Sequence, residues 1–173
     1  MSWQGELLHI HIAPDASYEM EELSEAHLVE GKGIVGDRYY KGTGTYSPKP
    51  DVREVTLIEM EALTALAYDD PPMHGAPIQM SPSDHRRNLT VRGVPLNHLV
   101  GWRFRIGECI LSGGRLNFPC KYIEELIGKP FFLPLYNRSG LNCRIEKGGI
   151  IRPGDVIEPL NEPTTFPHRQ QPV

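Results

Sequence analysis

A chain of 173 residues, of which 39% are hydrophobic and 23% charged, can bury the core of one globular domain, which argues against a two-domain enzyme. Its net charge of −4 offers no basic surface, so nucleic-acid binding is disfavoured as the main function. No apolar run approaches the roughly 18 residues of a membrane helix, and the N-terminus lacks a signal-peptide pattern. We therefore expect a cytoplasmic protein that does not bind membranes.

Glycine and proline content points to the fold class. Seventeen glycines and sixteen prolines indicate many turns between short elements, which favours strands over a helix bundle. We predict a mainly β protein, a closed or nearly closed barrel with a few short α-helices. Residues 1–160 should form this domain and residues 161–173 a proline-rich tail. The odd number of cysteines, at positions 109, 120 and 143, indicates a reducing compartment rather than a disulfide framework.

The N-terminal segment 6–12 alternates as a half-buried strand, with Leu8, Ile10 and Ile12 on one face and His9 and His11 on the other. Two histidines at this spacing can chelate a metal, but a pair facing solvent is the better interpretation because no third ligand is evident. Residues 20–29 are ambiguous, since the glutamates fit the start of a helix and the segment before Gly31 fits a strand.

A glycine-rich segment follows at residues 33–48. Its four glycines let the backbone approach a ligand, and Arg38 offers donors that suit phosphate or carboxylate, although a plain surface loop explains the pattern equally well. Residues 42–52 lack an apolar pattern, which suggests either a lid or a mobile rim. A β-branched strand at 53–58 and a helix at 59–67 come next.

Residues 84–93 combine a histidine, arginines and an asparagine directly before a strand. If the strand alternation extends through this cluster, Arg86 and Asn88 share one face, and His85 and Arg87 share the other. One pair can then line an anion-binding pocket. A charged strand edge that discourages aggregation is an equal alternative. Beyond it, Trp102, Phe104 and Ile106 alternate with arginines in an amphipathic strand that pairs with 109–112.

One cysteine stands at the start of a predicted helix over residues 118–127. Asn117 is a good N-cap, Pro119 suits the first turn, and Gly128 ends the helix. Cys120 would then lie in the first turn, where unpaired N–H groups favour an ionised thiolate. Alternatively Cys120 continues an apolar stripe with residues 123 and 127 and only packs inward. Short strands and glycine turns complete the chain.

Several of these segments together resemble the MOSC domain, named after the C-terminal domain of molybdenum cofactor sulfurases. The resemblance runs in matching order from about residue 30 to residue 158. The segments that carry it are Gly-Ile-Val-Gly-Asp-Arg at 33–38, Arg-Glu-Val-Thr-Leu-Ile at 53–58, His-Arg-Arg-Asn-Leu-Thr-Val-Arg-Gly at 85–93, Arg-Phe-Arg-Ile-Gly-Glu at 103–108, Phe-Pro-Cys at 118–120 and Gly-Gly-Ile-Ile-Arg-Pro-Gly-Asp at 148–155. It implies a barrel-like β fold and a site for molybdopterin, the pterin-bound molybdenum cofactor.

The resemblance also implies roles for single residues. Cys120 would be the reactive thiol, which ligates molybdenum or carries persulfide sulfur, and Arg86 and Asn88 would lie near the phosphate and pterin of the cofactor. Arg38 and Asp37 would shape the same pocket. A further cofactor-binding candidate is Arg138, where the family often has Arg-Gly-Gly and this chain has Arg-Ser-Gly.

Three functions remain open at this level. The first is a molybdenum-dependent oxidoreductase that reduces N-hydroxylated small molecules and receives electrons from a separate donor protein. The second is a sulfur carrier or sulfur transferase, loaded by a pyridoxal-phosphate-dependent cysteine desulfurase, that delivers sulfur to the molybdenum cofactor or to other metal–sulfur centres. The third is a binding module without chemistry. The chain has neither an electron-delivery domain nor a desulfurase domain, so the resemblance implies that these partners are separate proteins.

Overall fold

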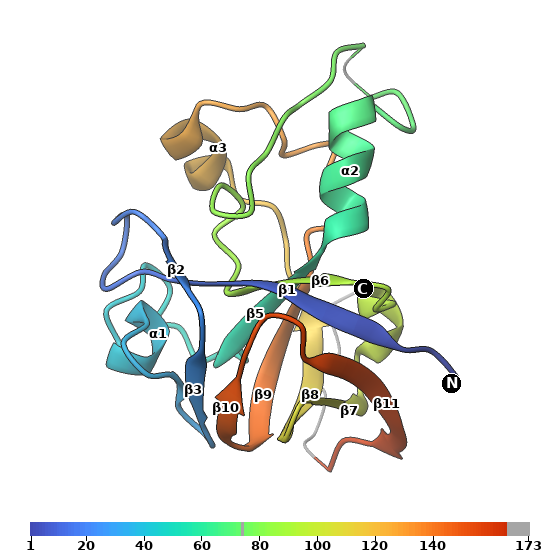
Figure 1. Ribbon diagram of the computed structural model, residues 1–173. Coiled ribbons are helices and arrows are strands. Elements are labelled where there is room, and N and C mark those ends of the chain that lie inside the picture. Colours follow the sequence, from blue (N-terminus) through green and yellow to red (C-terminus); the bar gives the residue numbers. More distant parts are fainter. Residues whose placement is uncertain (74, 166–173) are drawn as a thin grey trace.

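Seven strands close into a barrel in the computed structural model, which describes residues 1–73 and 75–165 (Figure 1). Neighbours around the ring run in the order β1, β6, β5, β9, β8, β7 and β11, and β11 pairs again with β1. The barrel strands are β1 (Gly5–Ile12), β5 (Val55–Glu59), β6 (Leu89–Arg92), β7 (Trp102–Ile106), β8 (Cys109–Leu116), β9 (Leu141–Lys147) and β11 (Val156–Pro163). The predicted fold class, a mainly β closed barrel, is confirmed.

Short elements surround the barrel. The strand β2 extends the edge of β1, and three further strands form a small second sheet in the order β10, β3, β4. The surrounding strands are β2 (Glu21–Leu23), β3 (Ala26–Val29), β4 (Gly33–Ile34) and β10 (Gly149–Ile151), and the helices are α1 (Arg38–Lys41), α2 (Met60–Tyr68), the 3-10 turn η1 (Leu96–Leu99) and α3 (Lys121–Ile127). The ambiguous segment 20–29 is therefore two strands and no helix. None of the helices in the described ranges is both long and apolar enough to span a membrane.

Closure of the barrel depends on β1, which pairs with two barrel strands. Its first residues pair with β11, with Gly5 opposite Ile157, and the rest pairs with β6. A register shift between Leu7 and His9 interrupts the alternation, so Leu7 rather than Leu8 points into the core. The predicted face of residues 8, 10 and 12 is therefore wrong at its first position.

The histidines of β1 also differ from prediction. His9 contacts Glu22 of β2 at 2.7 Å, whereas His11 is only 4% exposed. Burial lowers the pKa of His11, so its ring is held in the neutral form. The expected pair of solvent-facing histidines is thus one residue hydrogen-bonded to Glu22 at the surface and one buried residue.

Two hydrophobic clusters stabilise the molecule. The larger fills the barrel and includes Leu57, Phe104 and Leu111, all fully buried. The smaller lies under α2 and includes Leu63 and Phe131. Burial of each of these side chains contributes about 2 kcal/mol before its entropy cost. Figure 1 shows α2 and α3 beyond the same end of the barrel.

Several predicted elements are confirmed, and two boundaries are not. The strand and helix predicted at 53–67 are β5 and α2, and the predicted strand at 102–106 is β7. The helix predicted over 118–127 begins only at Lys121, and Cys120 rather than Asn117 is its N-cap. The strand β11 continues through Pro163, so the first residues assigned to a tail belong to the sheet. Residues 166–173 of that tail lie outside the described residues.

Candidate functional site

A pocket of about 210 Å³ brings Cys120 together with five arginines. It lies between the start of α3, the segment around α1 and the residues just before β6, and Figure 1 shows α1 and α3 on the same side of the barrel. Aromatic and amide side chains complete its wall. The lining residues are Arg38, Tyr39, Tyr46, Arg53, Thr56, Arg86, Arg87, Arg115, Asn117, Phe118, Pro119, Cys120, Ile123 and Asn142.

Cys120 is partly exposed and lines this pocket. Its backbone is extended, with φ −126° and ψ 125°, because it precedes the first helical residue of α3. The alternative that it packs inward with the helix stripe is only half right. Ile123 and Ile127 do pack on the smaller core cluster, but the thiol faces the pocket.

The hydroxyl of Tyr46 lies 3.1 Å from Cys120 Sγ. This hydrogen bond, together with burial, raises the pKa of Tyr46 to about 12, so the phenol keeps its proton at neutral pH. Either atom can donate while the thiol is protonated, whereas an ionised sulfur can only accept. In that state the O–H of Tyr46 stabilises the negative charge on the sulfur.

Tyr46 belongs to the lid segment, residues 42–52. Contacts with Arg53 and Tyr39 hold this segment against the pocket. Arg53 donates to the carbonyl of Tyr46, and its guanidinium lies 5.5 Å from the centre of the Tyr46 ring. A Cβ on Gly44 would come within 2.5 Å of the ring of Tyr39, so this part of the lid touches the pocket wall closely. The predicted lid is thus a closed, packed segment in this structure.

Arg86 is 8% exposed and lies in the left-handed region, with φ +59°. Its Nη1 donates to the carbonyl of Tyr18 at 2.8 Å, and its own carbonyl accepts from Arg38 Nη2 at 3.0 Å. Burial and the neighbouring charge of Arg38 lower the pKa of Arg86. Few non-glycine residues adopt this conformation, and its cost indicates that the surroundings hold Arg86 in place.

Arg87 is held more tightly still. It donates to the carbonyl and hydroxyl of Ser139 at 3.1 and 2.8 Å, to the carbonyl of His85 at 3.1 Å and to the carbonyl of Phe118 at 3.4 Å. Burial lowers the pKa of Arg87 to about 10, so it still carries its charge at neutral pH. Because it joins the segments around residues 85, 118 and 139, Arg87 positions the pocket as well as lining it.

The predicted alternation of residues 85–88 is wrong. The strand β6 begins at Leu89, and the left-handed turn at Arg86 rotates the chain before it. As a result Arg86 and Arg87 line the same pocket, although alternation assigns them to opposite faces. His85 is buried, contacts Thr90 at 3.0 Å and does not meet solvent.

The charges around the pocket do not balance. Asp37 pairs with Arg38 at 3.1 Å, and Asp51 pairs with both Arg53, at 2.6 Å, and Arg115. Burial works against ionisation of Asp51, but the two arginines outweigh it and lower its pKa. Within the described ranges no acidic side chain lines the pocket, and Arg86 and Arg87 have no carboxylate partner. The pocket therefore holds excess positive charge.

Of the site residues predicted from sequence, Cys120, Arg86 and Arg38 line the pocket. Asp37 does not line the pocket. It is the N-cap of α1, and its side chain accepts a hydrogen bond from the backbone N–H of Tyr39 at 3.1 Å. Asn88 is fully buried: it accepts from the backbone and hydroxyl of Thr56 and donates to the carbonyl of His11, so it joins three strands.

Arg138 lies elsewhere too, donating to the carbonyls of Pro134 and Asp70. In this loop the residue after it, Ser139, binds Arg87, as described above. Gly140 is the position that needs a glycine, since its φ is +103° and a Cβ would lie 1.9 Å from the Leu57 carbonyl oxygen. The Arg-Ser-Gly departure from the family pattern therefore leaves the essential glycine in place.

Sequence reasoning did not single out most of the other lining residues as site residues. Among them are the tyrosine that contacts the thiol and three of the arginines, namely Tyr46, Arg53, Arg87 and Arg115. Strand alternation placed Arg87 with His85, on the face opposite Arg86. No local pattern marked Tyr46, which contacts a cysteine 74 positions away.

The MOSC domain model matches residues 47–158. The chain belongs to the MOSC family. Among solved structures, it is similar to the YUAD protein from Bacillus subtilis, with a TM-score of 0.73 and 22% identity over 90% of this chain and 97% of that one. It is also similar to YiiM from Geobacillus stearothermophilus, with a TM-score of 0.65 and 13% identity over 91% of this chain and 75% of that one.

A third structure, YiiM from Escherichia coli, has a TM-score of 0.63 and 17% identity over 94% of this chain and 71% of that one. At these identities the likeness shows a shared fold. A search of curated protein sequences found no significant match.

The donor set of the pocket fits the cofactor that the MOSC family implies. In the part of the chain that the structure describes, no three His, Cys, Asp or Glu side chains are grouped to hold a metal. A metal here would take one soft ligand, Cys120, from the protein and the others from its cofactor. The guanidinium groups suit a phosphate.

The other two thiols are unsuited to such a role. Burial raises the pKa of Cys109 to about 11 and raises the pKa of Cys143 well above its usual range. Both are buried in the barrel core.

Proposed function

We propose that this MOSC protein binds the molybdenum cofactor, with Cys120 as the protein ligand of the metal. The observation that carries the proposal is that a partly exposed thiol and five guanidinium groups line one pocket. A thiolate is the ligand that a thiophilic metal prefers, and arginines offer paired donors to a phosphate. Bound there, the metal would supply the redox chemistry for reduction of N-hydroxylated small molecules, with electrons from a separate protein.

The protein groups have distinct tasks in this proposal. Tyr46 donates to the sulfur of Cys120 and orients it, while Arg86 offers N–H groups to the phosphate. Arg87 holds the loops that carry both. The lid segment excludes water. Since about 210 Å³ is below the roughly 300–1,000 Å³ of pockets that enclose larger ligands, the lid must move to admit the whole cofactor.

Metal and pterin content tests this proposal. Protein purified from a host that makes the cofactor should contain molybdenum and pterin, and Cys120→Ala should lose most of the molybdenum. Arg86→Gln should lose pterin and metal together. The matched controls are Cys109→Ala, a thiol outside the pocket, and Arg105→Gln, an arginine paired with Glu158 on the barrel surface. A wild-type protein without molybdenum, or full loading of Cys120→Ala, contradicts the proposal.

A second candidate function is a persulfide carrier for the molybdenum cofactor or another metal–sulfur centre. It is favoured by the partial exposure of Cys120, because a sulfur that accepts and passes on another sulfur atom has to be reached by both partners. In this function the donor would be a pyridoxal-phosphate-dependent cysteine desulfurase. Mass spectrometry after incubation with such an enzyme and cysteine should show one added sulfur on Cys120. No added sulfur contradicts this function.

A further inference from the structure

Arg86 has donors that the protein does not use. The side chain is 8% exposed and lines the pocket, yet only its Nη1 has a partner, the Tyr18 carbonyl. Its Nε and Nη2 have no acceptor among the described residues and are not sealed from solvent, so both are open to a ligand in the pocket. The left-handed backbone at Arg86 costs free energy, which indicates that the surroundings hold the side chain at this position.

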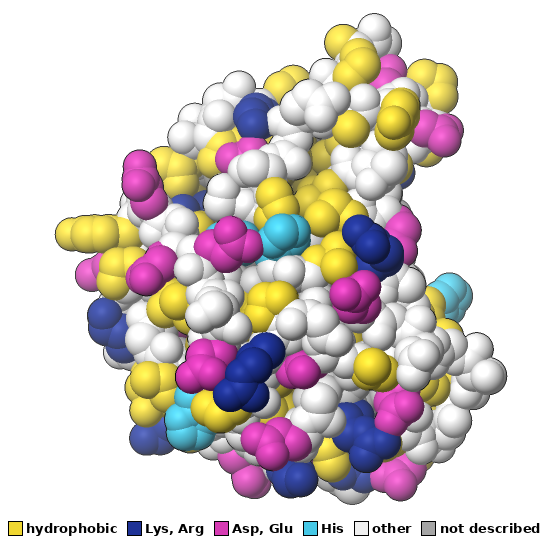
Figure 2. All heavy atoms as spheres, in the orientation of Figure 1, with side chains coloured by type: hydrophobic (Ala, Val, Ile, Leu, Met, Phe, Trp, Pro, Cys, Tyr) yellow, Lys and Arg dark blue, Asp and Glu magenta, His cyan; other side chains and the backbone are white. Residues whose placement is uncertain are grey.

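The electrostatics point to an anion, and the volume points to a small one. Of the five guanidinium groups around the pocket, Arg86 and Arg87 have no carboxylate partner in the described ranges. The other three share Asp37 and Asp51, so three positive charges remain in excess. Figure 2 shows acidic and basic side chains interspersed over one outer face, so there opposite charges lie close together. About 210 Å³ accommodates an ion of a few heavy atoms beside Cys120 with the lid closed.

We propose that the pocket accepts a small sulfur oxyanion of the thiosulfate class and that Cys120 takes the outer sulfur from it. This inference rests on the second candidate function, in which Cys120 carries sulfur, and it names a small-molecule donor for that function. The arginines bind the three sulfonate oxygens, and the thiol lies in the same pocket.

The reaction balances without an oxidant or a reductant. The Cys120 thiol loses its proton to water and its sulfur attacks the outer sulfur of thiosulfate. A new sulfur–sulfur bond forms, the sulfur–sulfur bond of thiosulfate breaks, and sulfite leaves with the electron pair of that bond. Cys120 is left as a persulfide anion, to which the hydroxyl of Tyr46 can donate. Excess positive charge in the pocket stabilises the departing sulfite.

The test uses cofactor-free full-length protein and sodium thiosulfate. We expect intact-protein and peptide mass spectra to show one added sulfur on Cys120 and none on Cys109 or Cys143, with one sulfite released per chain. Arg86→Gln should slow the reaction at low thiosulfate concentration by at least about tenfold, since a charged hydrogen bond is lost. Arg86→Lys should restore part of the rate, and Arg105→Gln should leave it unchanged.

A pair of alkylating reagents separates recognition of charge from general reactivity of the thiol. Iodoacetate is an anion and iodoacetamide is neutral, and both attack the same sulfur. Arg86→Gln should slow the iodoacetate reaction of Cys120 much more than the iodoacetamide reaction. Equal slowing of both reagents contradicts an anion subsite and indicates damage to the site as a whole.

A parallel arm with desulfurase and cysteine distinguishes the two possible failures. Persulfide from the desulfurase but not from thiosulfate overturns the small-molecule donor and leaves the carrier function standing. Persulfide from neither donor overturns both. Equal rates with thiosulfate for wild-type protein and Arg86→Gln overturn the role of the pocket in recognition.

Discussion

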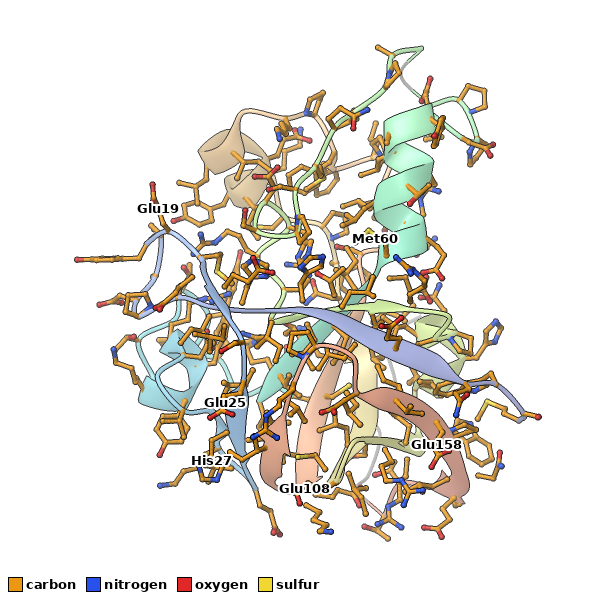
Figure 3. The ribbon with its side chains drawn as sticks, in the orientation of Figure 1. Glu19, Glu25, His27, Met60, Glu108 and Glu158 are labelled. Carbon is orange, nitrogen blue, oxygen red and sulfur yellow. The ribbon has the colours of Figure 1, made fainter. Side chains whose placement is uncertain are left out.

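The arginines of the pocket differ from those at the opposite end of the barrel. There, Arg103 contacts Glu146 at 2.7 Å and also pairs with Glu162, and Arg105 pairs with Glu158. Figure 3 shows Glu25, Glu108 and Glu158 at that end, away from α2 and α3, with Met60 at the foot of α2. Both of these arginines have a carboxylate partner, whereas in the pocket three arginines share two carboxylates and Arg86 and Arg87 have none among the described residues.

The contrast shows that burial and the supply of carboxylates decide what an arginine can do. On the surface, water and a neighbouring glutamate neutralise the charge, so the pair contributes little to stability and recognises nothing. In the pocket, Arg87 is buried among carbonyl groups and Arg86 keeps unused donors. The same residue type therefore forms surface ion pairs at one end and is available to an anion at the other.

The largest effect should come from Arg87→Met, which removes four hydrogen bonds at once. Loss of the donor leaves the carbonyls of Ser139 and His85 buried without a partner, so we expect the free energy of unfolding to fall by about 3 kcal/mol. Urea denaturation of both proteins measures this change in the free energy of unfolding. Retention of wild-type stability would mean that Arg87 is no more a structural residue than the surface arginines.

Anion binding should give the next effect. Sulfate at about ten times its Kd should stabilise the wild-type protein by about 1.4 kcal/mol, because the ion binds only the folded state. Chloride at the same ionic strength controls for screening and Arg105→Gln for surface charge. In Arg86→Gln the difference between sulfate and chloride should vanish. The same stabilisation in that variant would show that sulfate acts through general salting-out.

The buried His85, which lies beside Arg87, should make the stability of the protein depend on pH. Burial, and to a lesser degree the charge of Arg87, hold the pKa of His85 well below its usual range. The unfolded chain takes up a proton near its ordinary pKa of about 6.5 and the folded protein does not, so stability is full above that pH and falls as pH decreases below it. The loss is at most about 1.4 kcal/mol per pH unit for one proton.

Unfolding of His85→Gln at pH 7.5 and 5.5 measures this dependence. The variant should lose less stability on acidification than wild-type protein does. His27→Gln, which changes an exposed residue of β3, is the matched control and should keep the wild-type slope. An unchanged slope in His85→Gln would locate the acid sensitivity in other groups, such as His11.

The smallest effect is expected at the far end. Arg105→Gln removes an ion pair whose side chains are 47% and 36% exposed, so the free energy of unfolding should change by less than about 0.5 kcal/mol and respond to salt. Thermal unfolding at low and high ionic strength checks it. A loss comparable to that of Arg87→Met would remove the distinction between the two groups of arginines.

Local patterns were sufficient for much of the fold. The β-branched run at 53–58 and the helix formers after it predicted β5 and α2, and the alternation at 102–106 predicted β7. They failed where a single residue departs from the regular backbone. The register shift after Leu7 and the left-handed turn at Arg86 each reverse the direction of the side chains that follow. Neither position is a glycine, so the sequence contains no local signal of the irregular backbone.

The sequence by itself determined the β-rich class, the family resemblance and the candidacy of Cys120, because each depends on residue type and short-range order. Only the tertiary structure decided which charges meet that sulfur. Tyr46, Arg53, Arg86, Arg87 and Arg115 come from segments far apart in the chain and converge because the barrel closes. Their role depends on burial and on the carboxylates beside them, and both are properties of packing rather than of sequence order.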